Sequence, residues 1–566
     1  MQVFVIALAA LTVIVVASAF SRRTGLATPL LLVVLGIAGS YLPGVPDIEI
    51  DPELVLAGIL PPLLYASAVR FPVTDLRRNL RMITWLSVVL VAGSAVVIGF
   101  VVNLVFAQIP LGLAVALGAV VSPTDAVAAT SVGRRLGLPP RLMSLLEGES
   151  LVNDASALVV LRTAIASVGS AFSFAEATGQ FAWAVVGAVL VGLVVGAASG
   201  WVRGRIDDPV LATTVSFAVP FAAYFPAEEL AASGVLAVVV SGIATGVTSA
   251  KNTSARTRQT VAINWATISF IGESALFLLM GLQLPGLARS LSDDSVWVVI
   301  AGSALVCGLL IVLRALGVAV LLLGERRQPR RRDRAQRRIE AADERLSQFE
   351  PQTQAQERKF AVWERRVAQV RADSDYHEQQ RLNWRGGVVL GWAGMRGAIT
   401  VAAAQTIPYE LPHRSTVVLI AFNVAVVTLL GFGATLPAVI RAMRFESPTK
   451  EAKRAELVEL MRSATDTVVA RLGPLSEQQV DGEQVDPKLA ETISRRLSPL
   501  LSGHTLSPLA GRPDAREQVH QLQGRYLDAL REAVLDEQSI GAYRTETFTA
   551  ALALLDREEA RLERLE

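Results

Sequence analysis

The sequence predicts an all-α polytopic membrane protein with about 13 transmembrane helices, two of them broken, in an inverted-repeat arrangement, followed by a helical cytoplasmic domain. Hydrophobic residues make up 52% of the 566 positions, and the mean hydropathy is +0.44. Apolar runs of about 17 to 28 residues recur from Val3 to Met443, and each could cross a hydrocarbon core of about 30 Å. Basic and acidic loops alternate between these runs, and this alternation indicates which loops face the cytoplasm.

The predicted spans follow the apolar runs. They lie near residues 3–20, 26–43, 52–69, 82–107, 110–133, 141–168, 177–202, 208–226, 231–248, 259–286, 294–323, 385–407 and 415–443. Alternate loops collect arginines, for example Arg22 and Arg23, whereas the intervening loops collect acids such as Glu228 and Glu229. Basic loops stay in the cytoplasm, so we expect the N-terminus outside and the C-terminus in the cytoplasm of a multi-pass protein of the cell membrane.

Two regions outside the spans, an insert and a C-terminal region, differ from the spans in composition. Residues 1–444 form the predicted transmembrane domain, in which 325–384 is a cytoplasmic basic helical insert, and residues 445–566 form a helical regulatory domain. The insert carries eight arginines from Arg326 to Arg338, and such charge beside a membrane indicates contact with anionic lipids. Nucleic acid is a poor alternative, because this run adjoins a span and lacks interleaved aromatic residues.

Several charges fall deep within the predicted spans. A charge at the bilayer centre costs about 2.5 to 3.5 kcal/mol, so such a residue is a functional candidate. At 1.5 Å per residue from Arg141, Glu149 lies ~12 Å and Asp154 ~20 Å into its span. The same count puts Arg396 ~16 Å and Glu273 ~21 Å deep. Asp125 is also well inside its span.

Two other arginines have a simpler interpretation. Arg162 and Arg314 fall about 30 Å along their spans, at the far interfaces. A long side chain can reach the headgroups from there, so we expect both arginines to snorkel.

The span from 141 presents two polar edges. Glu147, Ser150 and Asp154 share one helical face, and Glu149 and Asn153 lie on a second stripe about a quarter-turn away. One edge could hold a cation, whereas the other could pair with Arg396, the only base near that depth. Because the deep acids outnumber the base, the excess negative charge favours a cation. The alternative is a structural network in which each acid is protonated or paired, with Glu149 and Arg396 locking two helices together.

Two spans are expected to break near their middles. Pro123 removes a backbone donor, and Thr124 and Asp125 are suited to cap the following half-helix. Gly391, Gly394 and Gly397 surround Arg396 in a second weakened span. The two spans are seven apart and therefore cross in opposite directions, as corresponding helices do in transporters built from inverted repeats.

Five stretches identify a family. They are LPPLLYASA at 60–68, SPTDAVA at 122–128, GESLVNDA at 148–155, ESALFLLMGL at 273–282 and GMRGAITVA at 394–402. In this order they resemble the sodium/proton antiporter family, the monovalent cation:proton antiporters of NhaP and NHE type. The resemblance implies a homodimeric antiporter with a core that moves in an elevator-like way and a role in pH homeostasis. It departs at Ala66, where many members have an acid.

The resemblance also assigns roles. It implies that Asp154 binds the cation or a proton, and that Ser150, Thr124 and Asp125 line the site, with Asp154, Ser150 and Thr124 as ligands of the ion. It further implies that Glu149 pairs with Arg396, and that the Asn153–Asp154 pair is typical of the electroneutral branch. Glu273, Glu147 and Pro123 are secondary candidates. No cofactor is expected beyond the transported ions.

The predicted function is exchange of a monovalent cation, foremost Na⁺ but also Li⁺ or K⁺, for H⁺. Protonation and cation binding would exclude each other at Asp154, so exchange would proceed by alternating access without ATP. The sequence contains no GxxxxGK[ST] motif for a nucleotide. A cation channel could use the same acids, and an intramembrane aspartyl hydrolase could use Asp125 and Asp154 as a dyad. The four histidines are scattered, which argues against a metal-dependent enzyme.

Overall fold

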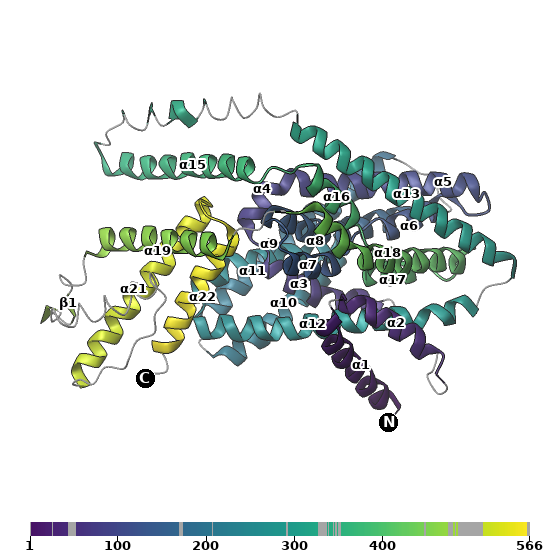
Figure 1. Cartoon of the computed structure of the whole chain (residues 1–566), viewed down its shortest axis with the longest axis horizontal. Helices are drawn as coiled ribbons and strands as arrows, with labels where there is room; N and C mark the ends of the chain where they lie inside the picture. Colours follow the sequence, from purple (N-terminus) through teal and green to yellow (C-terminus); the bar gives the residue numbers. More distant parts are fainter. Residues whose placement is uncertain are drawn as a thin grey trace. The chain divides into compact units, whose positions relative to one another are not determined.

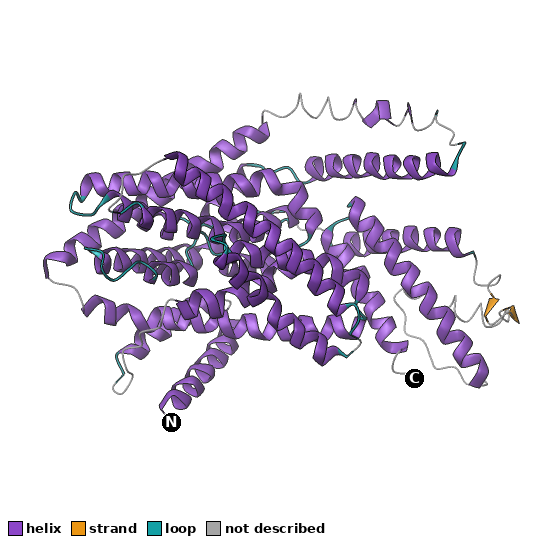
Figure 2. Cartoon of the chain, turned by 180° about the vertical axis from the view of Figure 1, so that it is seen from behind, coloured by secondary structure: helices purple, strands orange, loops and turns teal. Residues whose placement is uncertain are grey.

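A computed structural model shows a chain that is helical almost throughout (Figures 1 and 2). It describes residues 2–24, 26–42, 53–168, 174–206, 208–289, 293–326, 352–445, 449–473 and 513–562, with short pieces within 337–348 and 479–484. The arginine-rich run predicted to contact anionic lipids lies outside the described residues, apart from Arg326 and Arg337. The chain divides into two compact units. Unit 1 comprises Met1–Thr253, Thr257–Arg326 and Leu382–Phe445, and unit 2 comprises Ser254–Arg256, Arg327–Arg381 and Glu446–Glu566.

The helices of unit 1 follow the predicted spans. They are α1 (Gln2–Thr24), α2 (Thr28–Ser40), the π-helix η1 (Leu54–Ile59), α3 (Leu60–Arg70), α4 (Val73–Thr84), the π-helix η2 (Trp85–Val89), α5 (Leu90–Val105), α6 (Leu111–Val121), α7 (Ala126–Leu136), α8 (Pro140–Ala166), α9 (Phe174–Arg203), α10 (Pro209–Glu229), α11 (Gly234–Asn252), α12 (Ala255–Arg289), α13 (Asp293–Arg326), α16 (Trp384–Trp392), α17 (Ala398–Gln405) and α18 (Arg414–Met443). Seven helical stretches among the described residues are long and apolar enough to cross a membrane, and four shorter helices are also apolar. The prediction of an all-helical, multi-pass membrane protein is therefore confirmed.

Unit 1 contains two groups of closely packed helices. In the first group α5 packs on α6, α6 and α4 pack on α8, and α18 packs on α13 and α17. In the second group α11 lies against α3, α9 and α10. Both helix breaks expected from the sequence are in the first group, between α6 and α7 and between α16 and α17.

Glycines allow the backbones of α9 and α11 to approach closely. Gly192, Gly196 and Gly200 recur every fourth residue along α9, and this glycine stripe faces α11. A Cβ on Gly192 would lie 2.6 Å from the Ala237 carbonyl oxygen, and one on Gly196 would lie 2.8 Å from that of Ser241. Small residues at this spacing let membrane helices bind through backbone contact, without interlocking large side chains. The stripe therefore fixes the separation of the two helices.

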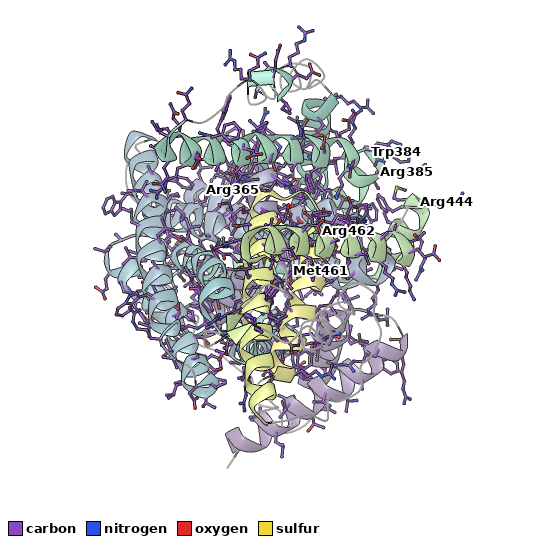
Figure 3. The ribbon with its side chains drawn as sticks, turned by 90° about the vertical axis from the view of Figure 1, so that its left-hand side faces the viewer. Arg365, Trp384, Arg385, Arg444, Met461 and Arg462 are labelled. Atoms are coloured by element: carbon purple, nitrogen blue, oxygen red, sulfur yellow. The ribbon has the colours of Figure 1, made fainter. Side chains whose placement is uncertain are left out.

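Unit 2 has its own small hydrophobic core. Its described elements are α15 (Gln354–Gln379), α19 (Lys450–Leu472), α21 (Pro513–Ile540), α22 (Thr545–Leu562) and the strands β1 (Gln479–Val480) and β2 (Glu483–Gln484). The two strands pair in antiparallel fashion, which the all-α prediction did not include. The apolar faces of α19, α21 and α22 meet around Leu460, Val534 and Phe548. Met461 of α19 is buried in this core, whereas the adjacent Arg462 is exposed (Figure 3).

The insert helix α15 belongs to unit 2 and contacts the helix α21. The Arg365 guanidinium lies 2.9 Å from an Asp536 carboxylate oxygen and donates to the Ser539 hydroxyl at 2.6 Å. Gln369 Nε2 donates to the Ser539 carbonyl at 3.2 Å. The insert and the C-terminal region are therefore in direct contact, although the contacting residues are 170 and 171 positions apart in the sequence.

The glycine stripe generates a stability prediction. Gly196→Ala would push a Cβ into α11, so we expect a loss of about 1 to 3 kcal/mol of stability from overpacking. The matched control is Gly179→Ala in the same helix, where a Cβ would meet nothing within 4 Å. The control should be neutral or slightly stabilising, because alanine favours a helix over glycine. Thermal unfolding in detergent measures both, and equal unfolding temperatures would contradict the proposed packing.

Candidate functional site

The first broken helix ends and restarts around Pro123. Helix α6 stops at Val121 and α7 begins at Ala126, so four residues between them are not helical. Asp125 is the N-cap of α7, and its Oδ1 accepts a hydrogen bond from the Val127 amide at 2.7 Å. A carboxylate is favourable at the positive end of a helix dipole. The break thus places an acidic side chain inside the protein.

The second broken helix crosses the first at this point. Helix α16 stops at Trp392 and α17 begins at Ala398. The Asp125 amide donates to the Met395 carbonyl at 2.8 Å, so the two breaks satisfy each other's backbone groups. Gly397 permits this approach, because a Cβ there would lie 2.6 Å from the Cβ of Asp125. The crossing therefore depends on the absence of a side chain at Gly397.

Arg396 completes the crossing by binding backbone carbonyls. Its Nε donates to the Val121 carbonyl at 2.7 Å and its Nη2 to the Ser122 carbonyl at 3.4 Å, and it also contacts the Gly394 carbonyl. Its own amide donates to Thr428 Oγ1 at 3.3 Å. A cation is favourable at the C-terminal end of a helix, so Arg396 caps α6.

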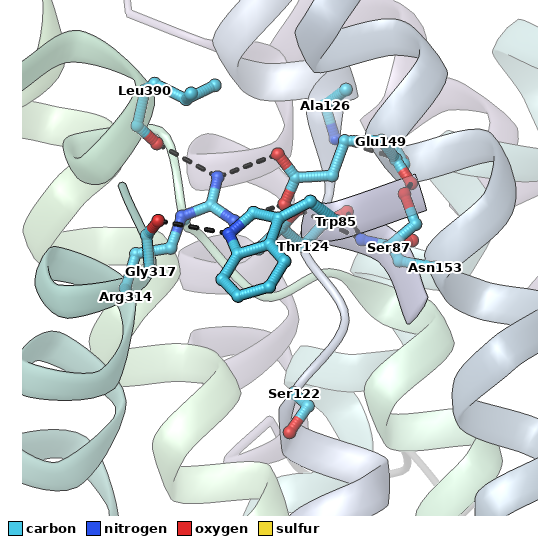
Figure 4. Close-up of polar contacts among 12 residues, drawn as sticks. Trp85, Ser87, Ser122, Thr124, Ala126, Glu149, Asn153, Arg314, Gly317 and Leu390 are labelled. Atoms are coloured by element: carbon cyan, nitrogen blue, oxygen red, sulfur yellow. Dashed lines mark hydrogen bonds and ion pairs between the residues drawn. The ribbon is translucent and has the colours of Figure 1, made fainter. Parts of the chain in front are cut away.

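Helix α8 attaches to the first break through its two polar edges. Asn153 Nδ2 donates to the Thr124 carbonyl at 3.2 Å and to its hydroxyl at 3.0 Å. The Ser150 hydroxyl accepts from the Ala126 amide at 3.3 Å. These bonds hold the middle of α8 against the non-helical residues of the break (Figure 4). These bonds bring Thr124, Ser150 and Asn153 together beside Asp125, with which Asp154 interacts electrostatically.

The prediction that Glu149 pairs with Arg396 is wrong. Glu149 pairs instead with Arg314 of α13, whose Nη2 lies 2.8 Å from Glu149 Oε2 and whose Nη1 contacts Oε1. Arg314 Nη2 also donates to the Leu390 carbonyl at 2.9 Å, and Thr124 Oγ1 donates to Glu149 Oε1 at 2.9 Å (Figure 4). The two paired side chains are only 1% and 6% exposed.

The expectation that Arg314 snorkels at an interface is therefore also wrong. It placed the far interface about 30 Å from the start of the span, but the helix has 34 residues, or ~51 Å at 1.5 Å per residue. Arg314 lies well inside this length, and its side chain points to Glu149. A lone arginine in an apolar run was the only signal in the sequence, and it did not reveal the partner. Arg162, by contrast, is half exposed and pairs with Glu228 at 2.7 Å.

Asp154 has no partner of this kind. Its side chain is buried, with 5% exposed, and among the residues that the structure describes no hydrogen bond or ion pair reaches its carboxylate. The nearest electrostatic interaction is with Asp125, another acid. Two acids near each other repel when both are ionised, and either a proton or a bound cation relieves this repulsion. Asn153 Oδ1, on the residue before Asp154, is buried and has no partner in the described chain.

The secondary candidates lie at different places. Glu147 is 31% exposed and pairs with Arg134 at 2.6 Å, so it lies outside the buried cluster. Glu273 of α12 interacts electrostatically with both Asp125 and Arg70. Pro123 lies in the break itself and is buried. Trp85 of η2 was not expected, and its indole donates to the Gly317 carbonyl of α13 at 3.2 Å.

The crossing predicts a difference between two glycines of the second broken span. Gly397→Ala would place a methyl group against the Asp125 carboxylate, so the crossing must shift or open. We expect a loss of about 1 to 3 kcal/mol, the usual cost of overpacking. In Gly391→Ala the new Cβ meets nothing within 4 Å, so the unfolding temperature should not fall. A stable Gly397→Ala protein would contradict the observed contact.

The corrected ion pair predicts an energetic coupling. In a double-mutant cycle with Glu149→Gln and Arg314→Gln, we expect a coupling of about 1 kcal/mol or more, because the two side chains touch and are buried. Glu149→Gln combined with Arg396→Gln should couple more weakly, since no hydrogen bond or ion pair joins those two described residues. Chemical or thermal unfolding supplies the energies. The reverse order of the couplings would restore the original pairing.

Comparison with known proteins identifies the family of the chain. A family model described as "Sodium/hydrogen exchanger, transmembrane" matches residues 7–442. The Na⁺/H⁺ antiporter ApNhaP of Aphanothece halophytica is 28% identical over 78% of this chain and 74% of its own. The low-affinity Na⁺/H⁺ antiporter NhaS1 of Synechocystis is 27% identical over 90% and 88%.

Two further comparisons concern ion range and fold. A sodium, potassium, lithium and rubidium/H⁺ antiporter of Bacillus pumilus is 28% identical over 83% of this chain and 66% of its own. The structure of the sodium proton antiporter MjNhaP1 from Methanocaldococcus jannaschii matches with a TM-score of 0.55 and 15% identity, over 79% of this chain and 100% of that one. This chain thus belongs to the sodium/hydrogen exchanger family, and it is a monovalent cation/proton antiporter rather than an enzyme.

Proposed function

We propose that the protein exchanges Na⁺ for H⁺ across the cytoplasmic membrane, with Li⁺ or K⁺ as further substrates, in an electroneutral cycle of alternating access. Asp154 would hold either the cation or the proton. The names of the relatives support this choice, since two are sodium/proton antiporters and a third also transports potassium, lithium and rubidium. Electroneutral exchange follows if one carboxylate trades one proton for one monovalent ion.

The observation that carries the proposal is the contrast between two neighbouring acids. Glu149 is neutralised by Arg314, whereas Asp154 is buried and makes no hydrogen bond or ion pair in the described chain. A buried carboxylate without a partner is costly when ionised, so it must take up a proton or a cation. Arg314 is engaged by Glu149, and no lysine or arginine of the described chain pairs with Asp154.

The oxygens around Asp154 suit a small monovalent cation. The Asp154 carboxylate, the Ser150 hydroxyl and the Thr124 carbonyl are the proposed ligands, with Asp125 and the free Oδ1 of Asn153 beside them. Oxygen atoms are the ligands that alkali and other hard cations prefer. The two amide hydrogens of Asn153 orient Thr124, so Asn153 acts chiefly by positioning that residue. Glu273 would attract cations toward Asp125.

The wider arrangement is proposed from the sequence and the family. We infer about 13 membrane crossings with inverted repeats around the two broken helices, an outside N-terminus and a cytoplasmic C-terminus. The transmembrane domain would comprise residues 1–444, and residues 445–566 would form a regulatory domain. A homodimer, and contact of the basic insert with anionic lipids, complete the proposal.

A cation channel remains the second candidate that the same acids could serve. The crossing argues for a transporter, because Asp125, Met395 and Arg396 join the two broken helices through hydrogen bonds to backbone groups. Broken helices of this kind line the substrate site in transporters of alternating access. Strict coupling of the cation flux to an opposite proton flux separates the two mechanisms.

Removal of the Asp154 carboxylate is the direct test. In proteoliposomes, Asp154→Asn should abolish proton efflux driven by an inward Na⁺ gradient while the protein stays folded, because an amide cannot carry the exchanged proton. The matched control is Asp208→Asn, since Asp208 caps α10 and asparagine caps a helix equally well.

The same assay tests the remaining parts of the proposal. An imposed membrane potential should leave the wild-type rate unchanged if the exchange is electroneutral, and Na⁺, Li⁺ and K⁺ gradients rank the substrates. Undiminished exchange by Asp154→Asn would refute the site. Cation flux without any proton movement would favour the channel.

A further inference from the structure

The helix that carries Asp154 is joined to α13 at a second place. At the start of α8, Arg141 Nη2 lies 3.2 Å from Glu325 Oε1 at the end of α13. Both side chains are buried, with 2% and 9% exposed. The first junction is Glu149 with Arg314, described above. The backbones of α8 and α13 do not pack closely along their lengths, so long side chains make this connection.

The two junctions have opposite charge order. At the first junction α13 supplies the base, Arg314, and α8 the acid, Glu149, whereas at the second α8 supplies the base, Arg141, and α13 the acid, Glu325. The junctions are ~12 Å apart along α8 and ~16 Å apart along α13, and they require the helices to run antiparallel. A shift of either helix would leave buried charges unpaired or bring like charges together. The double junction therefore fixes the register of α13 on α8.

Helix α4 reinforces the junction at Arg141. Asn79 Oδ1 accepts a hydrogen bond from Arg141 Nε at 3.3 Å, and Ser144 of α8 donates to Asp75 Oδ2 at 2.6 Å. Asn79 also donates to the Asp75 carbonyl at 3.1 Å. These groups form a buried polar cluster at one end of α8, ~15 to 20 Å along the helix from Asp154. The cluster thus belongs to the frame that supports the site and not to the site itself.

Glu325 also lies at the exit of the chain from unit 1. Arg326 is the last residue of that stretch, and Arg327 already belongs to unit 2. Within unit 2, the insert helix α15 contacts α21 through Arg365 and Gln369. The chain therefore leaves α13 for unit 2 directly after the Arg141–Glu325 junction, and it passes between the two units again at Arg381–Leu382 and at Phe445–Glu446.

We propose that Arg141 and Glu325 are positioning residues that fasten the end of α13 to the ion-binding helix α8, so that the start of the insert moves together with Asp154 as one body. The inference rests on the proposed function, because it concerns motion during exchange. Its consequence is that the point at which the chain leaves unit 1 at the end of α13 belongs to the moving part of the transporter. The opposite possibility is a gate, in which the Arg141–Glu325 pair opens and closes in each cycle.

Charge exchange tests the positioning role in the full-length protein. Arg141→Glu and Glu325→Arg alone should lower the maximal Na⁺/H⁺ exchange rate per folded protein about tenfold or more, with the apparent KM for Na⁺ within about threefold. The combined variant should recover the rate to within about threefold, since it restores the pair. The control is Arg381→Gln, which removes an exposed ion pair with Glu378 and should change nothing.

Different outcomes overturn the inference or the proposed function. A folded charge-exchanged variant that stays as slow as the single variants overturns the inference, and so does a single variant with the wild-type rate. If the combined variant does not fold, Arg141→Lys decides, since it keeps the charge but reaches less far. Arg141→Lys should lose rate with little change in KM, and an unchanged rate overturns the inference. A wild-type protein without exchange refutes the proposed function itself.

Cross-linking distinguishes one moving body from a gate. Cysteines replace Arg141 and Glu325 in a Cys307→Ala background, because Cys307 is the chain's single cysteine. A short bifunctional thiol reagent then joins the two positions. The cross-linked protein should exchange at least as fast as the same protein before treatment, because the link replaces the missing ion pair. Loss of exchange on cross-linking, restored when a cleavable reagent is cut, would show a gate and overturn the inference.

Discussion

The arrangement of the site depends on one constraint, namely that backbone groups freed by a helix break inside a membrane need partners within the protein. Each unsatisfied group costs several kcal/mol in hydrocarbon. The two breaks meet this requirement jointly, because the Asp125 amide binds the Met395 carbonyl and Arg396 binds the Val121 and Ser122 carbonyls. Asn153 then binds the Thr124 carbonyl. The position of Asp154 on α8 follows from these contacts, since Asn153 is its neighbour.

Charge pairing decides which acid remains available. Glu149 is buried and has an arginine partner that contacts both of its carboxylate oxygens, so Glu149 and Arg314 serve as a structural connection between α8 and α13. Asp154, five residues further along the same helix, lacks such a partner in the described chain. The same local sequence therefore supplies one acid that is paired within the protein and one that is not. This division of roles is what a carboxylate-based exchanger needs.

The sequence predicted the helices and the breaks well, because both follow from local chemistry. Apolar runs of sufficient length become helices. Pro123 ends a helix through its own ring and missing N–H group, whatever the tertiary contacts around it. It also predicted which residues of GESLVNDA face the break, because the helical period fixes them. It failed for the partner of Glu149. Depth was counted from the start of each span, but α13 is longer than a bilayer is thick, and the count could not tell which of two deep arginines would reach the acid.

The glycine stripe on α9 has a consequence for the surroundings of the protein. Helices that touch through their backbones are held at a fixed distance by short-range contact, and no long side chain can yield between them. A bilayer thinner or thicker than the helices exerts a mismatch force, which tilt and side-chain rearrangement usually absorb. The α9–α11 pair can accommodate little of this mismatch by rearranging its side chains. Adaptation to membranes of different thickness must therefore fall to the helices that pack through larger side chains.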